Sequence, residues 1–362
     1  MKAQSGFTLI ELMIALALGL IISAAAIMLF LTSQKSYSLQ QGAAELQDNA
    51  NFGLNYITQD IRLTNLNTQV SQINDQTAQG GIVLTSSENA TRAAVVPPAT
   101  IGDLLSNISK SIVGTTAKEI LLSRSNGQTT GAAPAWTGAS NVQVSGSDIN
   151  SDQLVIQYKP QYVRIDNNTT KTPNNPDDDD WYGGYDCEGQ KIEFPVKTGT
   201  TDTPLRIIVQ RYFLRQDSAK DPKEPNQALA LACDSGWYKE SGNPTKIENY
   251  GDAGEIIIRR VDHFRVLLGV QINATTLRYI PIKDYMELAA GSRPRILSVQ
   301  LGLLARSSQA VGNDNLVKDD QTFQVLDQLV KVKTPAITGT KYVRQVVSQT
   351  VALRNTFGER GQ

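Results

Sequence analysis

The chain has few of the residues from which most metal and catalytic sites are built. It holds one histidine and two cysteines in 362 residues. That excludes a multi-histidine metal site and a zinc site of the Cys/His type, which needs about three or four such ligands. Charged residues make up only 19% of the chain, with 34 Lys+Arg against 35 Asp+Glu. Because proteins that hold nucleic acid normally present a basic face, we expect no nucleic-acid partner. We also expect no metal and no cofactor.

A long apolar run lies near the N-terminus. Residues 7–31 read FTLIELMIALALGLIISAAAIMLFL and contain a single charge, Glu11. As a helix they measure roughly 37 Å, enough to cross a bilayer core of about 30 Å. The run exceeds the roughly 7–15 apolar residues of a secretory signal peptide, so a membrane-spanning helix is favoured. Lys2 precedes the run and Lys35 follows it, and the positive-inside rule favours an N-in orientation.

Glu11 needs a partner if this run enters a membrane. A carboxylate at such a position costs about 2.5–3.5 kcal/mol or more, and the neighbouring Leu9, Ile10, Leu12 and Met13 are apolar. A plain membrane anchor has no use for this charge. If the chain were cut after Gly6, the new terminal amine would be positive and one helical turn away. The same chain or a neighbour could then supply the countercharge.

The residues around this point resemble a known processing signal. The stretch SGFTLIELM at residues 5–13 resembles the type IV prepilin signature, a short leader that ends in glycine followed by F-T-L-I-E-L. The resemblance implies a leader of residues 1–6 and cleavage between Gly6 and Phe7 by prepilin peptidase. It also implies N-methylation of Phe7. Glu11 then becomes the assembly carboxylate, which pairs with the terminal amine of an adjacent subunit.

The helical pattern continues beyond the apolar run. An apolar stripe recurs at alternating steps of four and three: Leu39, Ala43, Leu46, Ala50, Leu54, Ile57 and Ile61. This spacing predicts one amphipathic helix, and we expect a single helix over residues 7–66. Its first half spans the membrane and its second half packs on a head, with Gly42 and Gly53 as breaks that allow slight bending.

The rest of the chain is expected to form the head. Residues 67–150 contain only nine charged residues and predict a polar, loop-rich insertion, which serves either as loops or as a partner-binding surface. Short runs at residues 120–122 and 142–144 are expected to be edge strands. Residues 151–362 predict a β-rich periplasmic head, with strands expected at residues 154–158, 205–214, 255–271, 295–305 and 342–354. A short helix is expected within residues 281–290. The predicted fold is α+β, a pilin-like long N-terminal helix on a mainly antiparallel sheet.

Three further groups of residues invite a functional reading. Cys187 and Cys233 are expected to form a disulfide in an oxidising periplasm, worth about 4 kcal/mol, the alternative being two reduced buried thiols. Asp177–Asp180, with Asp166, Asp186 and Glu188 nearby, is expected to be a solvated loop. Calcium is the alternative, although the spacing is not that of an EF-hand. Asp262 and His263 are adjacent in a predicted strand and so point to opposite faces, which favours a structural or surface histidine over a catalytic one.

Several segments of the head also resemble minor pilins of the PilW type. In chain order they are Asp60-Ile61-Arg62-Leu63, Asp186-Cys187 with Gly189, Arg211-Tyr212-Phe213, Leu231-Ala232-Cys233, residues 260–269, residues 296–307, and Arg344 through Leu353-Arg354-Asn355. The resemblance implies a non-enzymatic, low-copy subunit that primes pilus assembly near the tip.

The same resemblance implies partners and location. The expected partners are other minor pilins, the major pilin, prepilin peptidase, the inner-membrane assembly machinery and a tip adhesin. The expected location is the inner membrane as a single-pass protein with a periplasmic head, and afterwards the pilus on the cell surface. Alternatives are a type II secretion pseudopilin, whose heads are usually shorter, and a membrane-anchored adhesin or binding protein.

Overall fold

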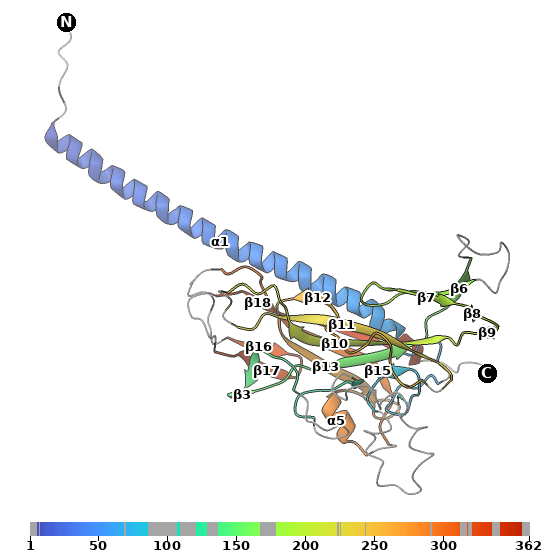
Figure 1. Cartoon of the computed structure of the whole chain (residues 1–362). Helices are drawn as coiled ribbons and strands as arrows, with labels where there is room; N and C mark the ends of the chain where they lie inside the picture. Colours follow the sequence, from blue (N-terminus) through green and yellow to red (C-terminus); the bar gives the residue numbers. More distant parts are fainter. Residues whose placement is uncertain are drawn as a thin grey trace.

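The computed structural model shows a long helix that carries a head of antiparallel sheets (Figure 1). The residues it describes are 6, 8–68, 70–85, 107–108, 121–128, 137–166, 179–222, 224, 226–242, 244–289, 292–311, 317, 321–334 and 341–356. The helix projects far beyond the head, and its N-terminal end lies well away from every sheet. This arrangement confirms the predicted α+β fold.

The long helix α1 spans Leu9–Leu63, close to the predicted limits of 7–66. Thr8 caps its start and Thr64 caps its end. The side chains or backbones buried along it are Gly42, Leu46, Ala50, Gly53, Leu54, Ile57, Thr58 and Ile61. The predicted stripe is therefore buried from residue 46 onward. Each fully buried Leu or Ile contributes about 1.5–3 kcal/mol to docking of the helix on the head.

Gly42 and Gly53 of α1 lie where the helix faces the head, and at Gly53 the packing is close. The helix runs through both without interruption. A Cβ on Gly53 would lie 2.1 Å from Ile258 Cγ1, and a Cβ on Gly42 would lie 3.5 Å from the Cβ of Ser307. Gly53 thus lets a strand of the head approach the helix backbone, which a larger residue would prevent.

Two larger sheets form the body of the head, and every strand pair in them is antiparallel. The first sheet has the order β1 (Gly81–Ile82), β4 (Leu154–Tyr158), β10 (Arg206–Gln216), β11 (Leu229–Lys239) and β12 (Glu255–Arg259). The second has the order β14 (Leu277–Pro281), β13 (Val261–Gln271), β15 (Ile296–Arg306) and β18 (Arg344–Ala352). The main hydrophobic core lies where both sheets meet Leu54, Ile57 and Ile61 of α1.

Smaller elements complete the head. A four-stranded sheet has the order β16 (Thr322–Val325), β17 (Gln328–Val332), β2 (Val142–Val144) and β3 (Ser147–Asp148). A three-stranded sheet contains β5 (Val163–Ile165), β6 (Asp180–Tyr185) and β7 (Lys191–Pro195), and β8 (Lys197–Thr198) pairs with β9 (Thr201–Asp202). The short helices are α5 (Ile282–Glu287) and η3 (Arg354–Thr356). The helix expected within residues 281–290 is therefore present.

Three short strands from residues 67–150 belong to the sheets of the head: β1, β2 and β3. Strand β1 pairs with β4, and β2 pairs with β17. The expectation that residues 142–144 form an edge strand is wrong, because β2 lies between β17 and β3. Leu121 and Leu122 are buried outside any strand, and Ile120 lies outside the described residues.

One predicted strand is two strands. The expected strand over residues 255–271 divides at Arg260, where φ is 59°, so that β12 belongs to the first sheet and β13 to the second. The guanidinium of Arg260 stabilises this corner by pairing with Asp217 at 2.8 Å and with Glu224 at 2.8 Å. Strand β11, which the sequence pattern did not indicate, lies between β10 and β12. Its small and polar residues, such as Asp234, Ser235 and Gly236, hide its strand character.

Candidate assembly arm and its junction with the head

The first turn of α1 holds the predicted assembly carboxylate. The carboxylate Oε2 of Glu11 accepts hydrogen bonds from the Thr8 backbone N–H at 2.9 Å and the Thr8 hydroxyl at 2.8 Å. The Glu11 N–H donates to the Thr8 hydroxyl at 3.3 Å, which completes a capping box. Gly6 is exposed and Phe7 lies outside the described residues. These neutral donors orient the Glu11 carboxylate, and among the described residues no cation pairs with it.

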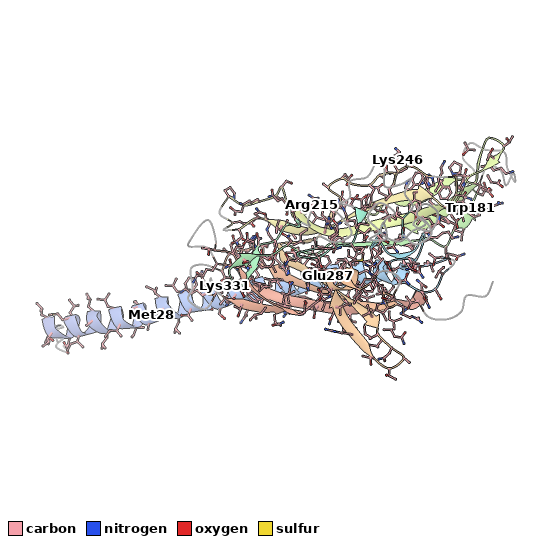
Figure 2. All side chains as sticks on the ribbon, turned by 90° about the horizontal axis from the view of Figure 1, so that it is seen from below. Met28, Trp181, Arg215, Lys246, Glu287 and Lys331 are labelled. Carbon is pink, nitrogen blue, oxygen red and sulfur yellow. A yellow bond between two sulfur atoms is a disulfide. The ribbon has the colours of Figure 1, made fainter. Side chains whose placement is uncertain are left out.

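Apart from Glu11 and Ser23, the Leu9–Leu31 part of α1 is apolar, and it is exposed along its whole length. Its large apolar side chains are exposed, from Leu9 at 77% to Leu31 at 51%. Figure 2 shows Met28 on this bare segment, far from Trp181 at the opposite end of the molecule. By length and composition α1 can cross a membrane. A surface of this size needs a cover, either lipid or other helices.

The head first contacts α1 in its middle. The Ser308 hydroxyl donates a hydrogen bond to the Glu45 carboxylate, and Leu46 and Ala50 pack against Ala305 of β15. Val347 of β18 packs against the same cluster. The helix is thus docked on the head from this region onward.

Farther along α1, a half-buried carboxyl links the helix to the first sheet. The Tyr212 hydroxyl of β10 donates to Asp60 Oδ2 at 2.9 Å and also lies 3.1 Å from Gln210 Oε1. Burial raises the pKa of Asp60 from 3.8 to about 6, against the lowering effect of the Tyr212 hydrogen bond. Asp60 therefore faces the head although it does not belong to the apolar stripe. The sequence shows the helix period but not that Tyr212 lies opposite.

The end of α1 is held by two more contacts. The Asn355 side-chain amide donates to the Arg62 carbonyl at 3.1 Å and to the Thr64 carbonyl at 3.0 Å. The Tyr56 hydroxyl donates to the Cys187 carbonyl at 3.2 Å. Several segments that resemble PilW-type pilins, distant in sequence, therefore meet where α1 docks on the head.

Cys187 and Cys233 form a disulfide beside this junction. Their Cα atoms are 6.2 Å apart, and 46 positions separate them in the chain. Both are buried, at 3% and 0% exposure. Because Cys233 belongs to β11 and Cys187 follows β6, the bond attaches the three-stranded sheet to the first sheet.

The predicted acidic cluster is divided between different places. Asp177 and Asp178 lie outside the described residues, Asp166 is exposed, and Asp180 is buried in β6. Asp180 therefore contradicts the expectation of a solvated loop, because strand pairing with β7 carries it into the head. The Asp186 carboxylate Oδ1 accepts from the Glu188 N–H at 3.0 Å and the Gln190 N–H at 2.8 Å, which shapes the turn before β7.

A different acidic group assembles near the disulfide. Carboxylate oxygens of Glu188, Asp234 and Asp252 lie within 4.8 Å of one another. Burial and the negative charges of Asp186, Asp234 and Asp252 raise the pKa of Glu188 to about 7. These oxygens suit a hard cation chemically. Asp234, however, is already paired with Arg211 at 2.8 Å, so protein charge occupies part of the group.

The pair Asp262 and His263 is part of the packed interior. The Asp262 carboxylate binds Arg344 at 2.7 Å and Asn141 at 2.8 Å, on the side away from the imidazole. The imidazole contacts the Ser140, Ser151 and Gln328 side chains at 3.3, 3.2 and 3.0 Å. Burial lowers the pKa of His263 to about 4. His263 is fully buried, which agrees with a structural role.

Two family models match the N-terminal motif and part of the head. A family model described as the prokaryotic N-terminal methylation motif matches residues 1–27, and one described as type IV pilus-assembly protein W matches residues 211–355. The type IV-like pilin TTHA1219 from Thermus thermophilus matches with 16% identity and a TM-score of 0.20, over 50% of this chain and 79% of that one. No curated protein sequence is significantly similar to the chain.

Proposed function

We propose that this chain, which belongs to the type IV pilus minor pilins of the PilW type, joins other minor pilins through α1 and primes pilus assembly near the pilus tip. The observation that carries the proposal is the half-docked helix. Its Leu9–Leu31 part is exposed all round, while Leu46, Leu54 and Ile61 are buried in the head. The bare half suits lipid first and neighbouring helices afterwards.

Processing at the N-terminus completes the proposed assembly site. Prepilin peptidase cleaves between Gly6 and Phe7, and Phe7 is then N-methylated. The new amine of a neighbouring subunit supplies the positive charge that Thr8 cannot give to Glu11, since Thr8 offers only neutral donors. In a low-dielectric environment such a pair is far stronger than in water, which favours one register between adjacent helices.

The proposed location follows from the same features. Residues 9–31 anchor the chain in the inner membrane with the N-terminus inside, and the head lies in the periplasm, where the Cys187–Cys233 disulfide is stable. The inner-membrane machinery then transfers the subunit to a filament with other minor pilins and the major pilin. The role is mechanical, through packing of helices and heads.

Mass spectrometry of sheared surface filaments tests processing and incorporation together. The expected result is a peptide that begins at N-methylated Phe7. A processed chain confined to the inner membrane would favour a secretion pseudopilin, and an uncut Met1 would refute the pilin assignment. An anchored adhesin, in contrast, predicts that deletion abolishes surface attachment and leaves filament number unchanged.

A substitution tests the assembly carboxylate. Glu11→Ala is expected to insert and to be cleaved normally, yet to lose co-purification with the other minor pilins. Asp48→Ala is the matched control, because Asp48 is an exposed acidic residue on the docked part of the same helix. Normal co-purification of the Glu11→Ala chain would contradict the proposed role of Glu11.

A further inference from the structure

Strand β18 is the outermost strand of the second sheet. The Leu353 N–H donates to the Leu297 carbonyl at 2.9 Å, and the Ser307 N–H donates to the Val343 carbonyl at 2.8 Å. With the register of β18 on β15, these bonds show that the backbone N–H and C=O groups of the odd-numbered residues of β18 point toward β15. In an antiparallel pair the alternate residues point the other way. The N–H and C=O groups of Ser348, Thr350 and Ala352 therefore point away from the sheet.

Among the described strands, β18 is the longest one at a sheet edge. The strands at the other sheet edges are at most five residues long: β1, β3, β5, β7, β8, β9, β12, β14 and β16. Strand β18 runs for nine residues without proline, lysine or a shift in register. Soluble proteins normally blunt such an edge, because its free backbone groups pair with other chains. No other described strand pairs with this edge of β18.

The usable part of the edge is its C-terminal half. Val346 and the outer face near it are covered by Phe323 and the four-stranded sheet. Ser348, Thr350 and Ala352 are exposed, and their side chains are small and uncharged. An approaching backbone therefore meets neither bulk nor charge there. Three N–H and three C=O groups are available to an extended segment about 4.8 Å away.

The direction of β18 limits what can bind. Val347 packs near Ala50, Gln349 donates to Asn55, and Asn355 donates to the Arg62 carbonyl. Strand β18 thus runs in the same direction as α1, beside it in Figure 1. Antiparallel pairing of β18 with β18 of a second copy would point the two α1 helices in opposite directions. Two arms in one membrane cannot do this, which disfavours antiparallel pairing between the β18 strands of two copies.

We propose that the Ser348–Ala352 edge of β18 accepts an extended strand from a different prepilin-type subunit, which adds a strand to the second sheet. The inference rests on the proposed function, since a neighbour whose helix lies beside α1 brings its head to this edge. Main-chain hydrogen bonds of this kind supply affinity, and the helices set the partner and its orientation. The heads then contribute to the order of subunits as well as the helices.

Paired substitutions in the full chain, co-expressed with the major pilin and the other minor pilins, test this surface. Thr350→Lys places a charge on the edge, and Gln300→Lys is its control, because Gln300 is the register partner of Thr350 on the inner strand β15. Ser348→Pro is a second variant, since it removes an N–H that makes no bond within the sheet. Thr350→Lys and Ser348→Pro are expected to lower recovery of the other pilins about tenfold or more, with wild-type recovery for Gln300→Lys.

The outcomes separate this inference from the proposed function. Normal recovery with Thr350→Lys, but loss with Glu11→Ala, would overturn the edge contact and leave helix-mediated assembly intact. Loss with Gln300→Lys as well would mean that the edge is not the determinant. A photo-crosslinker at Ser348, read by mass spectrometry, is expected to capture one contiguous segment of another pilin. The proposal would be refuted if the crosslinker at Ser348 captured a second copy of this chain or a protein that is not a pilin. It would also be refuted if the yield of crosslinked pilin were no higher than with the crosslinker at Gln300.

Discussion

Replacing Asp60 with asparagine should make the protein more stable near neutral pH. Burial raises the pKa of Asp60 from 3.8 to about 6, so the folded protein binds a proton there more readily than the unfolded chain. The unfavourable charged form is therefore present in the folded state above about pH 6, and its cost disappears as the pH falls. Stability of the natural chain should thus decrease as the pH rises from about 4 to 7.

The shift gives the magnitude. A difference of about 2 pKa units corresponds to about 3 kcal/mol over the whole titration, and about 1.4 kcal/mol of it falls between about pH 5 and pH 8. The Asp60→Asn variant lacks this titration, and its amide oxygen can still accept from Tyr212. Its advantage over the natural chain should therefore grow by about 1.4 kcal/mol between about pH 5 and pH 8.

Urea unfolding of the full chain in detergent, followed by tryptophan fluorescence, measures this difference. Asp48→Asn is the matched control, since Asp48 is exposed on the same helix and the exchange has the same effect on helix propensity. Parallel pH profiles for the Asp60→Asn and natural chains would refute the reasoning, because they would mean that Asp60 is solvated like Asp48. An Asp60→Asn chain that is less stable at every pH would mean that the Tyr212 hydrogen bond requires the carboxylate.

Two further variants test the packing around α1 and the disulfide. Gly53→Ala should destabilise the head by about 1–3 kcal/mol, although alanine favours helix, because the new Cβ would lie 2.1 Å from Ile258 Cγ1. Thermal unfolding measures this effect, with Gly19→Ala as the control because no atom lies within 4 Å of a Cβ at that position. Equal melting temperatures for the two variants would contradict the prediction. Cys187→Ser together with Cys233→Ser should lower the free energy of unfolding by about 4 kcal/mol, and the natural chain in reducing agent should unfold at the same urea concentration as this variant. A variant as stable as the oxidised chain would show that the bond adds no stability.

The sequence predicts those parts of the fold that depend on local pattern. The stripe from Leu46 to Ile61 has the helix period, and the structure buries it. The strand over residues 154–158 was predicted with the same limits because it is apolar and β-branched. Strand β11 was missed because its pairing with β10 and β12, and not its composition, makes it a strand.

The junction of α1 with the head depends on contacts between distant residues. Asp60 and Tyr212 are far apart in the chain, and only the folded arrangement brings the hydroxyl to the carboxylate. The need for glycine at position 53 also depends on a distant residue, because Ile258 packs against the helix backbone there. The acidic group of Glu188, Asp234 and Asp252 likewise combines residues from separate segments. Period and composition carry no information on such contacts.

The way α1 docks also determines how force on the arm reaches the head. Any machine that moves the subunit by its N-terminal half applies load along α1, and that load leaves the helix through side chains attached to both larger sheets. Leu46 and Ala50 transmit the load to β15 and β18, and Asp60 transmits it to Tyr212 of β10. The Tyr56 bond to the Cys187 carbonyl adds a path to β11 through the disulfide. Because parallel attachments share a load, loss of one of them should weaken the junction without releasing the helix.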